Sequence, residues 1–167
     1  MPLRRPFTDL AAALGLLLLA ACAGNSQRGA APGVNAAMAP KAPAAGVKIG
    51  KPYVVFGKTY VPADDRHYDA TGIASWYGPT FHAKATANGE IYNQDDITAA
   101  HKTLPMPSWV EVHNLDNGRK LTVRINDRGP FVDGRIIDLS RRSAQLLGVD
   151  VPGLARVRVK RVFPPED

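Results

Sequence analysis

Three stretches of the sequence hold more polar side chains and glycines than a small packed domain requires, namely residues 72–89, 88–101 and 126–140. Within them, the carboxyl groups of Glu90 and Asp127 and the imidazole of His101 are groups that donate or accept protons in acid–base catalysis. Each also has a structural explanation. Asp127 stands in a strong turn sequence, Glu90 follows an Asn-Gly pair and fits a solvated turn, and His101 fits a hydrogen-bonded core histidine.

Other kinds of catalytic site find no support in the sequence. The four histidines, at positions 67, 82, 101 and 113, show no metal-ligand spacing, and Cys22 is the only cysteine. The Gly-x-Ser-x-Gly pattern of a serine nucleophile on a strand-to-helix turn does not occur. We therefore expect neither a metal site nor a cofactor.

The elements that must position these residues are mostly β-strands. Apolar and polar side chains alternate along 120–126, which predicts a half-buried strand. A second strand is expected around 109–112, and Asp-Asn-Gly at 116–118 predicts a hairpin between the two. Valines alternate with basic residues over 156–162, which indicates another strand. Its basic side chains are expected on the solvated face, with a dedicated polyanion site as the alternative.

One short helix is predicted near the end of the chain. Ser140 is a good N-cap, residues 141–147 carry apolar side chains at helical spacing, and Gly148 stands where a left-handed residue ends a helix. Several short strands with one brief helix predict a small, mostly β barrel.

The N-terminus has the order of an export signal. Arg4 and Arg5 precede an apolar run over 10–21, which is too short to span a bilayer. The run ends in Leu-Ala-Ala before Cys22, which resembles the lipobox of bacterial lipoproteins, so we expect Cys22 to be lipidated. The alternative is that Cys22 is one more small residue of the signal. By resemblance to lipoprotein sorting rules, Ala23 implies an outer-membrane lipoprotein facing the periplasm.

The expected organisation has five parts: a signal peptide over 1–21, a flexible Ala/Pro/Gly tether over 22–47, an extended segment over 48–67 packing on the domain, a barrel over 68–163, and a tail over 164–167. Without the signal, 19 basic and 14 acidic side chains remain, a net charge of +5. A basic surface favours a polyanionic neighbour. Nucleic acid, anionic lipid and acidic cell-wall polymer all qualify, and the export signal favours the envelope over nucleic acid.

Five ordered blocks of the sequence together resemble the rare lipoprotein A family of lytic transglycosylases. The blocks are GIASWYG at 72–78, TANGE at 86–90, AAHKTLP at 99–105, VRINDRGPF at 123–131 and IIDLS at 136–140. The resemblance implies a fold that periodicity alone does not give, a six-stranded double-psi β-barrel with one or two short helices. It covers roughly residues 50–163.

The resemblance also implies an activity and its residues. Lytic transglycosylases break the glycosidic bond between N-acetylmuramic acid and N-acetylglucosamine in peptidoglycan, and the 6-hydroxyl of the muramic acid attacks its own anomeric carbon. The family's catalytic acid falls on Asp127, with Glu90 and His101 in supporting roles. The expected substrate-binding residues are Trp76, Tyr77, Asn88, Arg128 and Asp138.

Two rival functions remain at this point. The same groove could hold glycan without cutting it, as in an expansin-like binding protein, or two carboxylates could hydrolyse the bond with a placed water. The expected partners are peptidoglycan strands and, through Cys22, the membrane, with a monomer as the default state.

Overall fold

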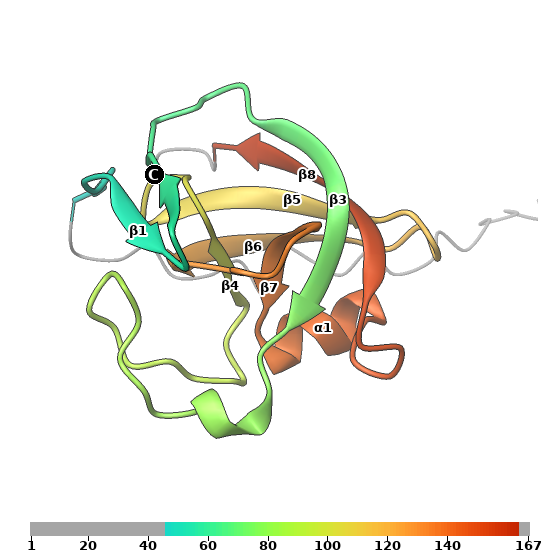
Figure 1. Cartoon of the computed structure of the whole chain (residues 1–167). Coiled ribbons are helices and arrows are strands. Elements are labelled where there is room, and N and C mark those ends of the chain that lie inside the picture. Colours follow the sequence, from blue (N-terminus) through green and yellow to red (C-terminus); the bar gives the residue numbers. More distant parts are fainter. Residues whose placement is uncertain (1–45, 164–167) are drawn as a thin grey trace, which may run out of the picture. The chain divides into compact units, whose positions relative to one another are not determined.

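A computed structural model describes residues 46–163, which form a β-barrel with one α-helix and a separate hairpin (Figure 1). Their elements, in chain order, are β1 (Tyr53–Val55), β2 (Lys58–Tyr60), β3 (Asp69–Trp76), the 3₁₀ turn η2 (Pro79–Phe81), β4 (Thr98–His101), β5 (Ser108–Asn114), β6 (Lys120–Asp127), β7 (Arg135–Leu139), α1 (Arg141–Leu147) and β8 (Ala155–Val162).

The barrel closes in the strand order β3-β7-β4-β6-β5-β8. Strands β3 and β7 run parallel, as do β4 and β6, whereas the other neighbours are antiparallel. The chain passes over β7 on its way from β3 to β4, and over β4 on its way from β6 to β7. These two interlocked crossings make a double-psi barrel. The expected fold class, a mostly β six-stranded barrel with a short helix, is confirmed.

The core follows from strict alternation along the antiparallel strands. In β5 and β8 every second side chain is buried, which places Val110, Val112, Val157 and Val159 inside the barrel. The predicted β5–β6 hairpin forms through the turn at 116–118. Along β8, Arg156, Arg158 and Lys160 are exposed as expected, but Arg161 is buried and approaches Asp64 at 3.7 Å.

The helix α1 begins and ends where the sequence predicts. The Ser140 side chain accepts the backbone N–H of Ser143, and Gly148 ends the helix with φ 70°. Ala144 and Leu147 bury the apolar face of α1 in the barrel core. The helix therefore closes one end of the barrel, directly after β7.

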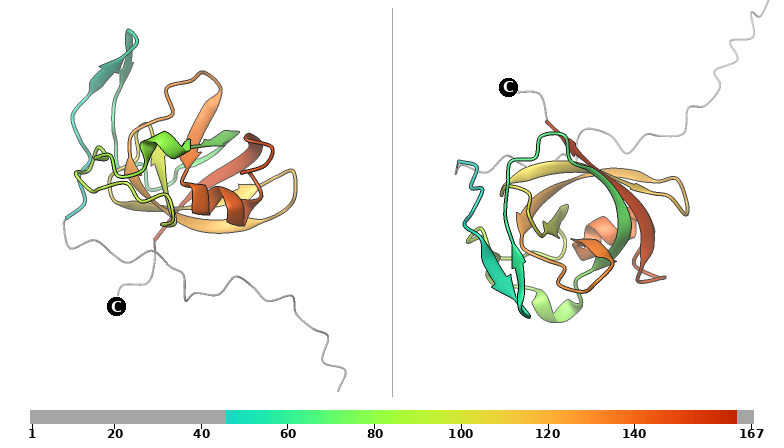
Figure 2. Two further views of the ribbon diagram at one scale, coloured as in Figure 1. Left: turned by 90° about the horizontal axis from the view of Figure 1, so that it is seen from below. Right: turned by 45° about the horizontal axis from the view of Figure 1, so that its top comes forward.

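Residues before β3 form the hairpin β1–β2, which projects from the barrel (Figure 2). The rings of Tyr53 and Tyr60 stack on each other and pack against Phe131, and the Tyr53 hydroxyl donates to the backbone carbonyl of Lys102. Lys48 exchanges backbone hydrogen bonds with Met106. These contacts fix the hairpin beside the loop that follows Asp127.

The predicted signal peptide, Cys22 and most of the predicted tether lie outside the described residues. Within residues 46–163, no helix has the length and apolar character needed to cross a membrane.

Candidate active site

Strand register brings residues of four neighbouring strands, three of them polar, into one row. Ser75 of β3 pairs with Asp138 of β7, Asp138 pairs with Ala100 of β4, and Ala100 pairs with Asp127 of β6. Directly paired residues of adjacent strands point to the same face of a sheet. Asp127 and Asp138 therefore share one face, on either side of the Ala100 methyl group.

The carboxylate of Asp127 is oriented by three hydrogen-bond donors. Its Oδ1 accepts the backbone N–H groups of Ala87 and Arg128, both at 2.8 Å, and its Oδ2 accepts the Tyr77 hydroxyl at 2.9 Å. The two N–H donors occupy both lone pairs of Oδ1. A proton on this carboxyl group must therefore sit on Oδ2, where the Tyr77 hydroxyl can turn from donor to acceptor.

Tyr77 reaches Asp127 from an aromatic cluster. Its ring packs against those of Tyr92 and Phe81, with centroids 4.8 and 5.5 Å away. Burial, and then the negative charge of Asp127, raise the pKa of the Tyr77 hydroxyl, so it keeps its proton. Tyr77, which was expected to bind substrate, thus also holds the Asp127 carboxylate through a hydrogen bond.

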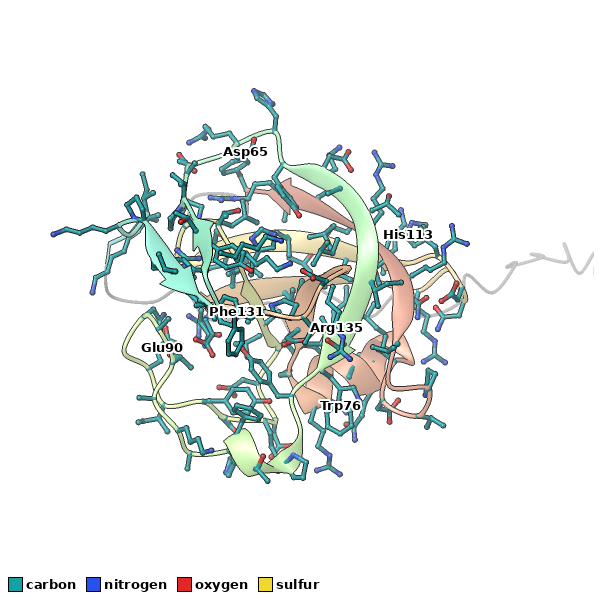
Figure 3. The ribbon with its side chains drawn as sticks, in the orientation of Figure 1. Asp65, Trp76, Glu90, His113, Phe131 and Arg135 are labelled. Carbon is teal, nitrogen blue, oxygen red and sulfur yellow. The ribbon has the colours of Figure 1, made fainter. Side chains whose placement is uncertain are left out.

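Glu90 lies in the loop between η2 and β4 (Figure 3), and side chains of β6 bind its carboxylate. The Arg124 guanidinium binds it through two parallel bonds of 2.6 and 2.7 Å, and the side-chain amides of Asn88 and Asn126 donate to the two carboxylate oxygens. The Arg124 hydrogen bonds, reinforced by the two asparagines, lower the pKa of Glu90 to about 2. Glu90 is therefore a permanent carboxylate and cannot serve as an acid near neutral pH.

His101 is buried and neutral. Its Nδ1 accepts the backbone N–H groups of Thr103 and Leu104, and its ring meets Tyr68 edge-on at 4.7 Å. Burial, and then the positive charges of Arg128, Lys102 and Arg161, lower the pKa of His101 to about 3. Because Nδ1 is an acceptor, the single proton sits on Nε2. His101 can offer a hydrogen bond from Nε2 but cannot take up a proton there.

Asp138 occupies the other side of the row. The Ser75 hydroxyl donates to its Oδ1. Burial raises the pKa of the Asp138 carboxyl, partly opposed by the Ser75 hydrogen bond and by the charges of Arg135 and Lys102. The negative charge of Asp127 adds a smaller rise.

The remaining predicted substrate-binding residues lie in different surroundings. Asn88 lies beside the site but uses its side chain within the chain, accepting from Thr86 and Glu90 and donating to Glu90. Trp76 follows Ser75 in β3 and so faces the other side of the sheet, where it packs against the core toward α1 (Figure 3). Trp76 therefore lies on the face opposite Ser75, and its binding of substrate stays a prediction.

Arg128, another residue expected to bind substrate, makes several contacts within the chain. Its guanidinium donates to the backbone carbonyls of His101 and Leu104 and, from the other nitrogen, to that of Ile49. It thereby ties the segment before β1 to the barrel. These hydrogen bonds hold the two segments together. The sequence pattern did not reveal them because Ile49 lies far away along the chain.

The interpretation of the sequence missed the two residues that hold Glu90. Alternation along β6 placed Arg124 and Asn126 on a solvated face, yet their exposed fractions are only 8% and 4%. The loop carrying Glu90 folds over them, and its carboxylate binds both side chains. Their only signal was their place in the 123–131 block.

A polar cavity of about 200 Å³ lies away from this row of residues. It is lined by Glu111, His113, Lys120, Arg158 and Lys160. Its lining comes from the outer face of β5, β6 and β8, and Arg158 is already paired with Asp69. No cluster of metal-ligating side chains occurs among residues 46–163.

Comparison with known proteins decides the family. A sequence model described as lytic transglycolase matches residues 69–159. The chain belongs to this lytic transglycosylase family. The similar proteins, named endolytic peptidoglycan transglycosylase RlpA, confirm the resemblance to rare lipoprotein A.

Two of these relatives of the rare lipoprotein A family define the extent of the match. The Pseudomonas aeruginosa (strain UCBPP-PA14) protein is 57% identical over 114 residues, which is 68% of this chain and 33% of the relative. The Campylobacter jejuni protein is 56% identical over 111 residues, 66% of this chain and 40% of the relative. The chain thus spans well under half the length of these two curated relatives.

Among solved structures, the chain is similar to the Streptomyces papain inhibitor, with a TM-score of 0.48, 24% identity, and coverage of 57% of this chain and 96% of the inhibitor. An expansin of Clavibacter michiganensis gives a TM-score of 0.47 at 17% identity, covering 60% of this chain and 53% of the expansin.

The ion pair of Glu90 predicts a loss of stability on substitution. Glu90→Gln leaves the nearly buried Arg124 guanidinium without its charge partner, so we expect the free energy of unfolding to fall by about 2–3 kcal/mol at pH 7. The contribution of the lowered pKa is complete above pH 4.5 and is lost as pH falls toward 2. Urea unfolding across this range measures the loss.

Glu111→Gln, whose 3.8 Å pair with Lys120 is exposed, is the control and should change stability little. Equal losses of stability in the two variants would refute the account.

The two nitrogens of His101 can be separated by substitution. The amide oxygen of His101→Asn can replace Nδ1 as the acceptor for Thr103 and Leu104, whereas His101→Gln places its polar group near Nε2. We expect the Asn variant to keep more of the unfolding temperature and the Gln variant to lose more. The opposite order in thermal unfolding would show that the acceptor bonds of Nδ1 do not hold this histidine.

Proposed function

We propose that this protein is an endolytic peptidoglycan transglycosylase, which cleaves the glycosidic bond after N-acetylmuramic acid and leaves a 1,6-anhydro end, in cell-wall remodelling or daughter-cell separation. The observation that carries the proposal is the Asp127 carboxylate, held by three donors at the barrel end. Membership of the lytic transglycosylase family and the activity in the relatives' names support it.

The reaction needs two proton movements and no water. One proton must reach the leaving oxygen, and another must leave the 6-hydroxyl as it attacks the anomeric carbon. Asp127 suits this chemistry because Oδ2 is its only oxygen with room for a proton, and its other contacts keep the carboxyl group from rotating. Preorientation of this kind removes a large part of the entropic barrier.

Glu90 and His101 assist without transferring protons. The ionised Glu90 holds the loop whose Ala87 N–H orients Asp127. His101 stays neutral and faces the other side of β4 from Asp127 and Asp138, where its Nδ1 holds the turn after β4 by accepting from Thr103 and Leu104. This division assigns proton transfer to the aspartates of the row.

The product spectrum tests the function. Purified sacculi, with and without amidase pretreatment, should yield anhydro-muropeptides or anhydro-glycans by mass spectrometry. Asp127→Asn keeps two oxygen lone pairs for Ala87 and Arg128 but cannot exchange the proton, so release should fall about a thousand-fold with the fold retained. Asp133→Asn, at a carboxylate that is 99% exposed, is the matched control and should cut normally.

Other outcomes identify the rivals. Reducing ends in place of anhydro ends would assign a hydrolase, and retention on sacculi without any product would assign an expansin-like binding protein. Full activity of Asp127→Asn would refute the role of this carboxyl group.

The protein's place in the cell is a second part of the proposal. We propose that Cys22 is lipidated and anchors the domain in the outer membrane, facing the periplasm, so that residues 23–45 connect lipid to barrel; the signal order and the lipobox support this. The chain should incorporate labelled palmitate and fractionate with the outer membrane. Cys22→Ser should lose the label, whereas an unlabelled wild-type chain would refute the anchor.

A further inference from the structure

Two carboxyl groups face the same space across a single small residue. Asp127 and Asp138 are both register partners of Ala100, one on each neighbouring strand. Adjacent strands lie about 4.8 Å apart, so the two aspartate backbones are about 10 Å apart, with the side chains on one face. Side chains that reach toward each other over Ala100 can bring the two carboxyl groups to the separation of about 5 to 9.5 Å at which such pairs act on one glycosidic bond.

Asp127 and Asp138 both stay partly exposed, whereas Ala100 between them is fully buried. Ala100 contributes only a methyl group. A Cβ on Gly129 would lie 3.8 Å from that methyl and 3.9 Å from Asp138 Oδ2, so the missing side chain leaves the approach to Oδ2 uncovered. Gly129 has φ 141°, a conformation that other residues rarely adopt. The backbone thus requires glycine at a point that borders Asp138 Oδ2.

The surroundings of the two carboxyl groups differ in kind. Asp127 receives two backbone N–H donors and the Tyr77 hydroxyl. Asp138 receives only the Ser75 hydroxyl, on Oδ1, and among the described residues nothing donates to its Oδ2. Burial raises the pKa of Asp138, while Arg135 and Lys102 oppose the rise and Asp127 adds to it. Unequal surroundings of paired carboxyl groups separate an acid from a base.

We propose that Asp138 is the catalytic acid of this site and that Asp127 is the base. This inference rests on the proposed function and divides the two proton transfers between two residues. It departs from the resemblance, which assigned the acid to Asp127 and a substrate-binding role to Asp138.

The protons balance in this scheme. Asp138 gives its proton to the bridging oxygen as the bond from the anomeric carbon to that oxygen breaks. The 6-hydroxyl oxygen of the same muramic acid bonds to the anomeric carbon, and its proton passes to Asp127 Oδ2. The pair ends with the proton on Asp127 in place of Asp138, and exchange with solvent restores the starting state without consuming water.

A leaving group that needs no proton separates the two roles. The probes are peptidoglycan glycan strands and a 4-methylumbelliferyl glycoside of a GlcNAc–MurNAc oligosaccharide, whose phenolate leaves unprotonated. Asp138→Asn should cut glycan strands about a hundred- to a thousand-fold more slowly but release the phenolate within about tenfold of wild type. Asp127→Asn should lose both activities, because the 6-hydroxyl still needs a base.

Three results would overturn the assignment. These are equal losses of Asp138→Asn on both probes, full activity of that variant on strands, or rescue of Asp127→Asn by the aryl leaving group. All three are scored against wild-type protein that makes anhydro ends. A wild-type protein that makes none refutes the proposed function itself, so the two failures are distinguishable. Thermal unfolding confirms that each variant is folded.

Ser75→Ala supplies a readout that a structural role would not move. The Ser75 hydrogen bond lowers the pKa of Asp138, so its removal raises that pKa further. The alkaline limb of the rate profile on glycan strands, which reports the acid, should move to higher pH. An unchanged limb in a folded, active variant would contradict the assignment of Asp138 as the acid.

Discussion

The site depends on the ion pair that joins Glu90 to Arg124 across two parts of the chain far apart in sequence. Backbone hydrogen bonds shape the loop before β4 from within, and the two-bonded guanidinium of Arg124, with Asn126, fastens it to β6. That attachment brings the Ala87 N–H to Asp127. Without it, the carboxylate would lose one of its three donors and the loop its position. The ionised Glu90 thus positions Asp127 indirectly, by binding Arg124.

The double-psi barrel explains why an acid pair arises at this place. Its two interlocked crossings put β7 between β3 and β4, and β4 between β7 and β6. Residues that are distant in sequence therefore become register partners in one row. The same barrel wall supplies both carboxyl groups, but hydrogen-bond donors surround Asp127 whereas burial dominates at Asp138. One rigid scaffold thereby gives two chemically identical side chains different tasks.

Local patterns predicted the local structure well. The β5–β6 hairpin and the capped helix α1 depend on alternation, turn residues and caps, all of which act within a few positions. The pairing of Arg124 and Asn126 with Glu90 could not be read this way, because it joins segments more than 30 residues apart and reverses the exposure that alternation predicts. The same holds for Arg128, whose partners include Ile49, and for Trp76, which the register turns toward the core. The motifs indicated where the site is, and the long-range contacts decided what each residue does there.

A crystal structure of the Asp127→Asn variant with a bound GlcNAc–MurNAc tetrasaccharide tests the account most directly. The account predicts that the bridging oxygen lies within hydrogen-bond distance of Asp138 Oδ2, and that the muramic 6-hydroxyl faces the amide at position 127 beside the Tyr77 hydroxyl. A tetrasaccharide bound in the cavity of β5, β6 and β8, with no sugar at Asp127 and Asp138, would contradict it.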